Sequence, residues 1–187
     1  MDWIKKRKWD LFFLLLLGLL LIPSVRMNVQ VFIQRIIASS PDELTESQKI
    51  AVESYDWELL TMDGELVNFS ESIGKPVVLN LWATWCPPCV AEMPALQNLY
   101  DLFNEEVDFY FVSSEDSEKL KKWLKTKGYN LPVYNAYSTF PRALESSTLP
   151  TTFVLDRQGR IVMKEVGSAK WDSDYMKNYL QGLVDEE

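Results

Sequence analysis

An almost unbroken apolar run at residues 77–82, followed by a helical pattern from about Pro87, is the feature that most constrains the fold. The run reads Val-Val-Leu-Asn-Leu-Trp, and such a β-rich run is typical of a strand that is covered on both faces. A strand of this kind lies in a sheet with further layers above and below it. The run therefore predicts a layered α/β domain.

The other patterns arrange two hairpins and three helices around this strand. Turn residues at 62–64 and at 156–159 each separate two strand-like segments, which predicts hairpins. The expected strands are 57–61, 65–69, 77–82, 107–113, 151–155 and 160–166, and the expected helices are about 87–103, 117–127 and 172–184. Strands that alternate with amphipathic helices in this order predict a central sheet flanked by helices.

The chain begins with a basic stretch and a charge-free segment. Residues 5–8 are all Lys or Arg, and residues 11–25 carry no charge. A helix over residues 11–25 would cover about 22 Å, short of the roughly 30 Å hydrocarbon core, although Trp9 and the cations suit the interface. We interpret residues 1–10 as a cytoplasmic basic tail and residues 11–25 as an uncleaved transmembrane signal-anchor.

A cleaved signal peptide is the alternative for this segment, but no A-x-A pattern of small residues follows it. Both interpretations put the rest of the chain on the periplasmic or extracytoplasmic side of the cytoplasmic membrane, because the basic residues keep the N-terminus inside. With the anchor uncleaved, the protein would be single-pass.

Residues 26–46 are expected to join this anchor to the domain. Apolar residues recur at helical spacing from Asn28 to Ala38, which fits a helix on the membrane surface or one packed on the domain. Residues 39–41, Ser-Ser-Pro, break this pattern, and we interpret the acidic polar stretch after them as a linker. The domain itself is expected at residues 47–187.

The chain has two cysteines, Cys86 and Cys89, and they stand where the buried strand turns into a helix. At a helix N-terminus the macrodipole and free amides favour a thiolate, so an exposed Cys86 is the expected nucleophile. Cys89, one turn further on, is the expected resolving thiol. Zinc needs about four ligands and the chain has no other cysteine and no histidine, so we expect no metal.

The composition excludes further classes of function. The 187 residues suit one domain with an appendage, and 27 acidic against 19 basic residues give a net charge of −8. Nucleic-acid binding by phosphate neutralisation is not expected of so acidic a chain. The absence of histidine removes His-based catalytic triads. We expect no cofactor besides the disulfide of the cysteine pair itself.

Residues 78–89, with Glu92-Met93-Pro94 after them, resemble thioredoxin-like proteins of the TlpA/ResA type. Those proteins are membrane-anchored thiol–disulfide oxidoreductases that act outside the cytoplasm, usually as reductants. The resemblance implies an α/β thioredoxin-like fold, with a central mixed β-sheet flanked by helices and an added N-terminal β-hairpin. One N-terminal transmembrane helix would precede it.

The resemblance also implies a substrate-binding loop. Residues 149–153, Leu-Pro-Thr-Thr-Phe, resemble the cis-proline loop of the family. Pro150 would then face the cysteine pair, and Leu149 would offer backbone hydrogen bonds to an extended peptide. Trp85 and Pro87, which flank Cys86, are further expected substrate-binding residues.

Glu92 matches an acidic residue that tunes the thiols in the ResA branch, which makes it the third candidate catalytic residue. It lies three residues after Cys89 and could exchange a proton with that thiol. The alternative is a solvated helix carboxylate. Asn80 stands where thioredoxins proper keep a buried aspartate, and an amide cannot accept the proton of Cys89.

The dipeptide Pro87-Pro88 gives an independent inference about the direction of electron flow. Prolines have no N–H, so two of the amides that would stabilise a Cys86 thiolate are missing and the amide of Cys89 is the main donor left. We expect a Cys86 pKa of roughly 7–8, far from the ~3.5 of a strong oxidant. A less stabilised dithiol has a more negative potential, which favours a protein-disulfide reductase.

The expected partners are disulfide-bearing client proteins, a membrane electron donor and the membrane itself. Apocytochrome c is a client that the resemblance implies and that no residue of this chain selects. A disulfide oxidase or isomerase is the alternative within the same class of enzyme. A non-catalytic peptide-binding or chaperone module that uses the Pro150 groove is the alternative from another class.

Overall fold

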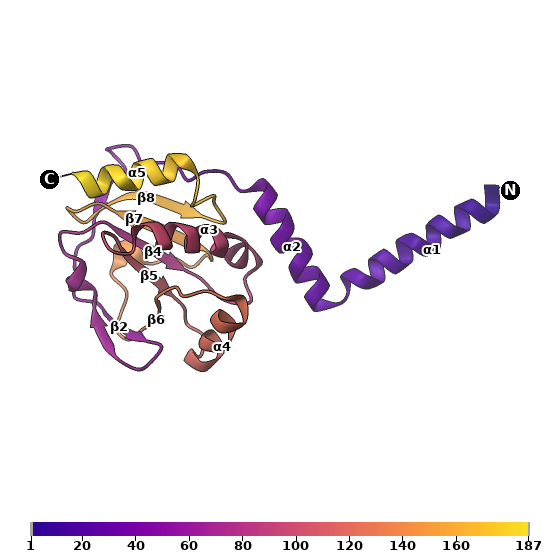
Figure 1. Ribbon diagram of the computed structural model, residues 1–187, viewed down its shortest axis with the longest axis horizontal. Coiled ribbons are helices and arrows are strands. Elements are labelled where there is room, and N and C mark those ends of the chain that lie inside the picture. Colours follow the sequence, from indigo (N-terminus) through magenta and orange to yellow (C-terminus); the bar gives the residue numbers. More distant parts are fainter. Residues whose placement is uncertain (1, 187) are drawn as a thin grey trace.

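The computed structural model describes residues 2–186. Helices pack against one mixed, eight-stranded sheet (Figure 1). The strand order is β1-β8-β7-β4-β5-β6-β2-β3. The strands are β1 (Ile50–Ala51), β2 (Glu58–Thr61), β3 (Leu66–Asn68), β4 (Val77–Leu81), β5 (Asp108–Val112), β6 (Val133–Ala136), β7 (Thr151–Leu155) and β8 (Arg160–Val166). The helices are α1 (Asp2–Leu20), α2 (Pro23–Ile37), α3 (Pro87–Phe103), α4 (Ser117–Lys127) and α5 (Asp174–Asp185), with short 3-10 helices η1 (Phe69–Ser72) and η2 (Arg142–Leu144).

Alternate residues of β4 enter two apolar cores on opposite faces of the sheet. Val78 belongs to the core that contains Leu96 of α3 and Leu180 of α5. Leu79 belongs to the other core, which contains Trp57. Every residue of β4 is buried, as the apolar run predicts for a strand with both faces covered.

The register of β4 decides which segments meet at its carboxyl end. Leu81 is opposite Val112 of the parallel strand β5 and opposite Thr151 of the antiparallel strand β7. The chain that follows Leu81 and the chain that precedes Thr151 therefore leave the sheet at the same edge. This edge brings the cysteine turn next to the Leu149-Pro150 loop.

Local signals account for the ends of α4. Asp116 is its N-cap and accepts a hydrogen bond from Lys119 N at 3.0 Å. Gly128 ends the helix in the left-handed region at a φ of 74°, where glycine meets no Cβ penalty. The helix ends predicted from the sequence are confirmed here.

Some elements differ from the prediction. The short strands β1 and β6 are not expected from the sequence, because neither is marked by a hairpin turn like the one that joins the equally short strands β2 and β3. The last helix begins at Asp174 rather than at about residue 172, and it turns Met176 and Leu180 inward while Tyr175 is 45% exposed.

The N-terminal segment is two helices rather than the expected single span over residues 11–25. The chain bends at Leu21 and Ile22, and Pro23 opens α2, because proline lacks the N–H that would continue α1 and fits the first turn of a new helix. Within residues 2–186 no single helix is long and apolar enough to cross a membrane. Residues 7–20 and α2 meet that test only together, as a pair bent by 92°.

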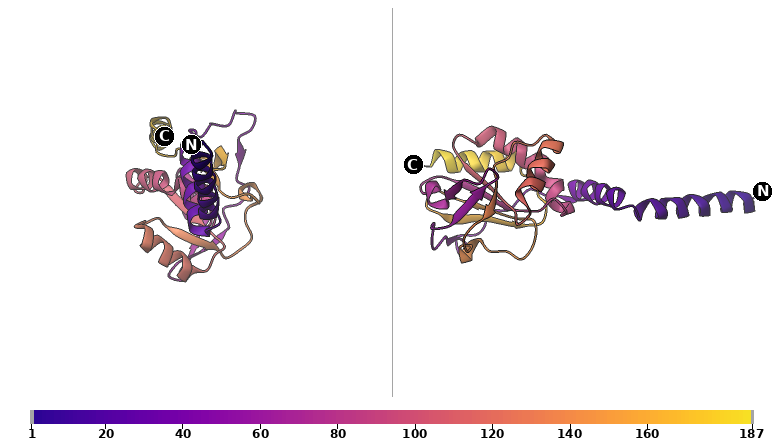
Figure 2. Two further views of the ribbon diagram at one scale, coloured as in Figure 1. Left: turned by 90° about the vertical axis from the view of Figure 1, so that its right-hand side faces the viewer. Right: turned by 90° about the horizontal axis from the view of Figure 1, so that it is seen from below.

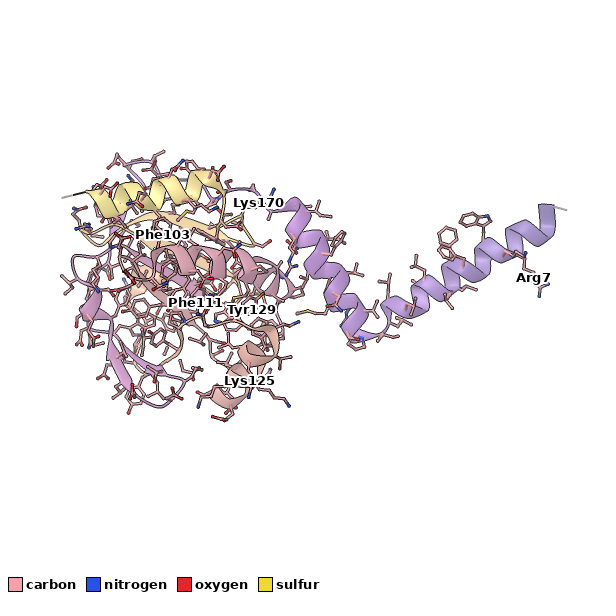
Figure 3. The ribbon with its side chains drawn as sticks, in the orientation of Figure 1. Arg7, Phe103, Phe111, Lys125, Tyr129 and Lys170 are labelled. Atoms are coloured by element: carbon pink, nitrogen blue, oxygen red, sulfur yellow. A yellow bond between two sulfur atoms is a disulfide. The ribbon has the colours of Figure 1, made fainter. Side chains whose placement is uncertain are left out.

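Residues 39–46, expected as a linker, lie along the sheet instead. Leu44 N donates to Val162 O of β8 at 2.8 Å, and Glu43 forms a β-bridge with Met163. Lys170 N donates to Ser39 O at 2.8 Å, at the point where the chain leaves α2 (Figure 3). These backbone groups find partners on the domain, which is why the stretch is not a free linker.

Gly159, in the turn between β7 and β8, allows the packing of this turn against Tyr55 to be tested. Its φ is +75°, and a Cβ there would collide with the hydroxyl and ring of Tyr55. Gly64, at a φ of +87°, has open space around it. We expect Gly64→Ala to lower the free energy of unfolding by about 1 kcal/mol, and Gly159→Ala to lower it by at least about twice as much. Urea unfolding of both variants in the oxidised state measures this, and equal losses would contradict the collision.

Candidate active site

The two cysteines form a disulfide at the N-terminus of α3. Their Cα atoms are 5.2 Å apart, and Cys86 is the N-cap residue of the helix. In this oxidised form Cys86 is 3% exposed and Cys89 is fully buried. The expectation of an exposed Cys86 is therefore wrong for this state, because the residue packs into the apolar core, although it remains the more accessible of the two.

The hydrogen bonds around the pair follow from the two prolines. Cys89 N is 3.3 Å from Cys86 Sγ and donates to it, while Pro87 and Pro88 have no N–H to offer. The next amide of the helix, Val90 N, donates to Cys86 O at 3.0 Å. The prediction that the Cys89 amide is the donor left to Cys86 is thus confirmed.

In the turn before the pair Trp85 is exposed, while its neighbour Thr84 is buried. Trp85 is 64% exposed, a large apolar side chain at the edge of the site. Glu115, from the loop after β5, accepts hydrogen bonds from Thr84 N at 2.5 Å and from Thr84 Oγ1 at 2.8 Å, and also binds Lys119. Burial alone would raise the pKa of Glu115, but the bonds from Lys119 and Thr84 outweigh it and the pKa is lowered.

The Leu149–Pro150 peptide bond is cis, as the resemblance implies. Leu149 packs against the core cluster that contains both cysteines. Pro150 O accepts a hydrogen bond from Gly167 N at 3.0 Å. In the part of the chain that the structure describes, the N–H and C=O of Leu149 have no hydrogen-bond partner, so they are free to pair with an extended peptide.

Glu92 is buried, so the alternative of a solvated carboxylate is wrong. The residue is 2% exposed, and its Oε2 accepts from Trp171 Nε1 at 2.8 Å and from Ala169 N at 3.3 Å. Its Oε1 accepts from Asn80 Nδ2 at 2.8 Å, and this amide also lies 2.7 Å from Thr152 Oγ1. Burial raises the pKa of Glu92 to about 8, and the three hydrogen bonds offset only part of that effect.

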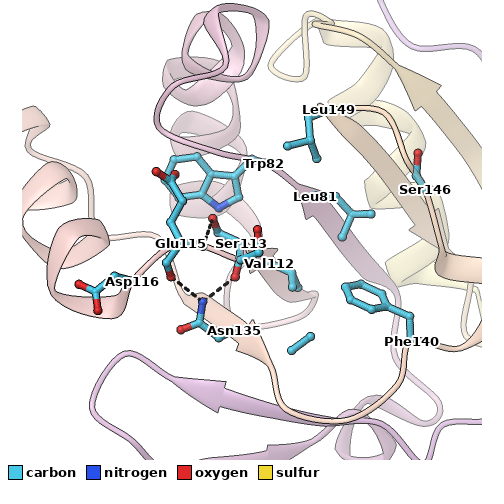
Figure 4. A pocket seen from close by; sticks show the side chains of 12 residues that line it. Leu81, Trp82, Val112, Ser113, Glu115, Asp116, Asn135, Phe140, Ser146 and Leu149 are labelled. Atoms are coloured by element: carbon cyan, nitrogen blue, oxygen red, sulfur yellow. Dashed lines mark hydrogen bonds between the residues drawn. The ribbon is translucent and has the colours of Figure 1, made fainter.

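A pocket of about 500 Å³ adjoins the Leu149 loop (Figure 4). Its apolar wall includes Trp82, Phe140 and Leu149, and its polar end includes Glu115 and Asn135. The amide of Asn135 donates to the backbone oxygens of Ser113 and Glu115, which fixes that end. Sequence reasoning missed this pocket, since its residues come from separate strands and loops and form no motif.

The fold and the site define a thiol–disulfide oxidoreductase with a thioredoxin-like fold. The chain belongs to the Redoxin family, whose model matches residues 41–180. The resemblance to the ResA type found in the sequence is confirmed by its relatives.

The chain is similar to two proteins named thiol-disulfide oxidoreductase ResA. It is 29% identical over 149 residues to that of Bacillus cereus, covering 74% of this chain and 81% of the relative. It is 30% identical over 151 residues to that of Geobacillus thermodenitrificans, covering 74% and 82%. Among solved structures, the exposed lipoprotein thioredoxin Etrx1 of Streptococcus pneumoniae is 28% identical with a TM-score of 0.55, covering 70% of this chain and 99% of that one.

Proposed function

We propose that this oxidoreductase reduces the disulfides of client proteins on the extracytoplasmic side of the cytoplasmic membrane. The observation that supports this direction is the shortage of amides around the Cys86 sulfur: within the described residues its Sγ accepts one hydrogen bond, from Cys89 N. A weakly stabilised thiolate makes the dithiol form less stable, so the pair gives up its electrons more readily.

The reaction passes through a mixed disulfide. In the dithiol form the Cys86 thiolate attacks one sulfur of the client disulfide, and the other client sulfur leaves as a thiolate. Cys89, as a thiolate, then attacks the Cys86 sulfur and releases the second client thiolate. The client gains two electrons and the chain ends with the Cys86–Cys89 disulfide, which a membrane electron donor has to reduce again.

Glu92 is the proposed proton acceptor for Cys89. Both residues lie on the buried side of α3, one helical turn apart. A carboxyl group with a pKa of about 8 titrates near the operating pH, which suits a group that takes the proton of one thiol and later returns it. Asn80 and Trp171 hold the carboxyl in place.

The proposed client groove lies between the cysteine turn and the cis-proline loop. Leu149 supplies free backbone groups, Pro150 shapes the loop, and Trp85 with Pro87 offers an apolar rim. An extended peptide that carries the disulfide fits such a surface. Apocytochrome c remains a proposed client from the family resemblance.

The proposed anchor is the apolar part of α1, with the basic residues at the N-terminal end of this helix on the cytoplasmic side. The large apolar side chains of α1 from Phe12 to Leu20 are 36% to 64% exposed, as in a helix that lipid surrounds. The proposed thioredoxin-like domain, residues 47–187, would then lie outside the cytoplasm. This arrangement gives the pair access to a membrane electron donor.

The equilibrium potential of the Cys86–Cys89 pair tests the proposed direction. Titration of the full chain in defined thiol buffers should give a value below about −220 mV. A value above about −150 mV would mean that the two prolines do not set the direction, and would favour an oxidase or isomerase.

A further inference from the structure

The helix α2 has an inward face that packs on the domain and an outward face that is apolar and exposed. Its inward face docks on the domain, where Val31 is buried, Arg35 Nε donates to Ala91 O at 3.2 Å, and Ser168 Oγ donates to Gln34 Oε1 at 3.2 Å. At about 100° per residue the opposite, outward face carries apolar side chains. These are Val29, Phe32, Ile33, Ile36 and Ile37, which are 38%, 65%, 49%, 63% and 65% exposed.

The outward face of α2 is expected to lie against an interaction partner. The free side of a helix that packs on a domain normally carries charged and polar residues, yet this side has no charge beyond Arg26 near its start. Five exposed apolar side chains on one stripe form a contiguous patch of the kind that marks an interaction site. Arg26 lies in the first turn of α2, close to the bend. Its cation can pair with a lipid phosphate there while the apolar stem of its side chain lies along the apolar face.

The bend between α1 and α2 indicates what lies against the outward face of α2. The two helices meet at 92°, and the domain and α1 lie on opposite sides of α2 (Figures 1 and 2). If α1 follows the bilayer normal, α2 lies in the membrane plane with the domain above it. Its outward face is then turned toward the lipid.

We infer that α2 is an interfacial helix, whose outward face rests on the surface of the lipid bilayer while its inward face holds the catalytic domain. This inference rests on the proposed membrane anchor α1. It unites the two alternatives that the sequence leaves open for residues 28–38, a helix on the membrane and a helix on the domain.

The length of α1 supports the same arrangement. The charge-free part of α1, residues 11–20, extends over about 15 Å, too short for a hydrocarbon core of roughly 30 Å. An interfacial helix sinks about 5–10 Å into the boundary, which leaves about 20–25 Å for α1 to cover. Trp9, two residues before this segment and 61% exposed, is thereby brought closer to the far headgroups.

The docking also places the redox pair near the membrane. A pocket of about 480 Å³ lies between α2 and the active-site turn, with Val31 and Arg35 on one side and Thr84 and Val90 on the other. Val90 directly follows Cys89, so the pair lies beside the helix that rests on lipid. A membrane-embedded electron donor would reach it there without a long excursion of the domain.

Fluorescence quenching in vesicles tests the inference on the full chain. In a Cys86→Ser/Cys89→Ser background, single cysteines at Ile36→Cys, Leu16→Cys and Gln181→Cys receive an environment-sensitive fluorophore. The protein is reconstituted in phosphatidylcholine–phosphatidylglycerol vesicles that carry nitroxide lipids, labelled near the headgroup or deep in the acyl chain. Circular dichroism confirms that each variant is folded.

We expect the Ile36 label to lose more than about half of its emission to the shallow nitroxide and much less to the deep one. The Leu16 label should respond to the deep nitroxide, and the label at Gln181, on the exposed side of α5, to neither. If neither nitroxide quenches the label at Ile36, the inference about α2 is overturned. The label at Leu16 then decides the proposed anchor: quenching at Leu16 supports the anchor, and no quenching contradicts it. If the fluorophores at Ile36 quench one another, and added unlabelled protein relieves this self-quenching, then a second copy of the chain covers this face of α2. That result would also overturn the inference.

Discussion

Replacing Cys86 by serine will abolish the reduction of client disulfides, while replacing Cys89 by serine will trap the chain as a mixed disulfide. The serine hydroxyl stays protonated at neutral pH and cannot attack a disulfide sulfur, so we expect at least about a 10³-fold loss of rate. In Cys89→Ser the attack still occurs, but no second thiol can release the client. Turnover of a disulfide-bearing peptide and mass spectrometry of the trapped adduct measure the two effects.

The two variants are matched controls for each other. Each removes the disulfide seen in the structure and leaves one thiol at the N-terminus of α3. A difference between them therefore reports the roles of the two sulfurs and not the loss of a cross-link. Accumulation of the adduct in Cys86→Ser rather than in Cys89→Ser would reverse the proposed nucleophile and resolving thiol.

Replacing Glu92 by glutamine will remove a large pH dependence of the stability of the oxidised protein. Burial raises the Glu92 pKa from 4.5 to about 8. The folded state therefore keeps a proton that the unfolded chain has lost, and this contribution is fully present below pH 4.5 and is lost as the pH rises through about 8. The loss is on the order of a few kcal/mol.

Urea unfolding of the oxidised wild type and of Glu92→Gln at pH 5 and at pH 9 measures this effect. The wild type should become less stable toward pH 9, whereas the variant, neutral at both values, should change little and should be the more stable chain at pH 9. Glu118→Gln, an exposed carboxylate on α4, is the matched control and should follow the wild type. Parallel curves for the wild type and Glu92→Gln would show that Glu92 is not held neutral by burial.

Much of the fold could be predicted because its signals are local. The apolar run predicts β4, the turn residues at 156–159 predict the hairpin of β7 and β8, and the helical pattern predicts α4 at residues 117–127. Each of these signals lies within a few residues of the element it specifies. The cysteine pair was found for the same reason.

The environment of Glu92 could not be predicted, because its partners come from distant parts of the chain. Ala169 and Trp171 lie 77 and 79 residues away in sequence, and no pattern marks them as partners of a carboxyl group. The spacing of Glu92 from Cys89 suggested proximity to the thiol but did not decide between burial and exposure. The pocket beside Leu149 was missed likewise, since Phe140 and Glu115 meet only in the folded chain.

The bonds that fix residues 39–44 to the sheet also bear on whether the domain can be shed by proteolysis. A protease needs backbone that can leave its surroundings and enter a cleft, and exposed, unbonded stretches are cut first. Here the backbone of Ser39 and Leu44 is bonded to Lys170 and Val162. Cleavage would require this stretch to peel away from β8 first, so we expect the domain to stay joined to its N-terminal helices rather than be released as a soluble fragment.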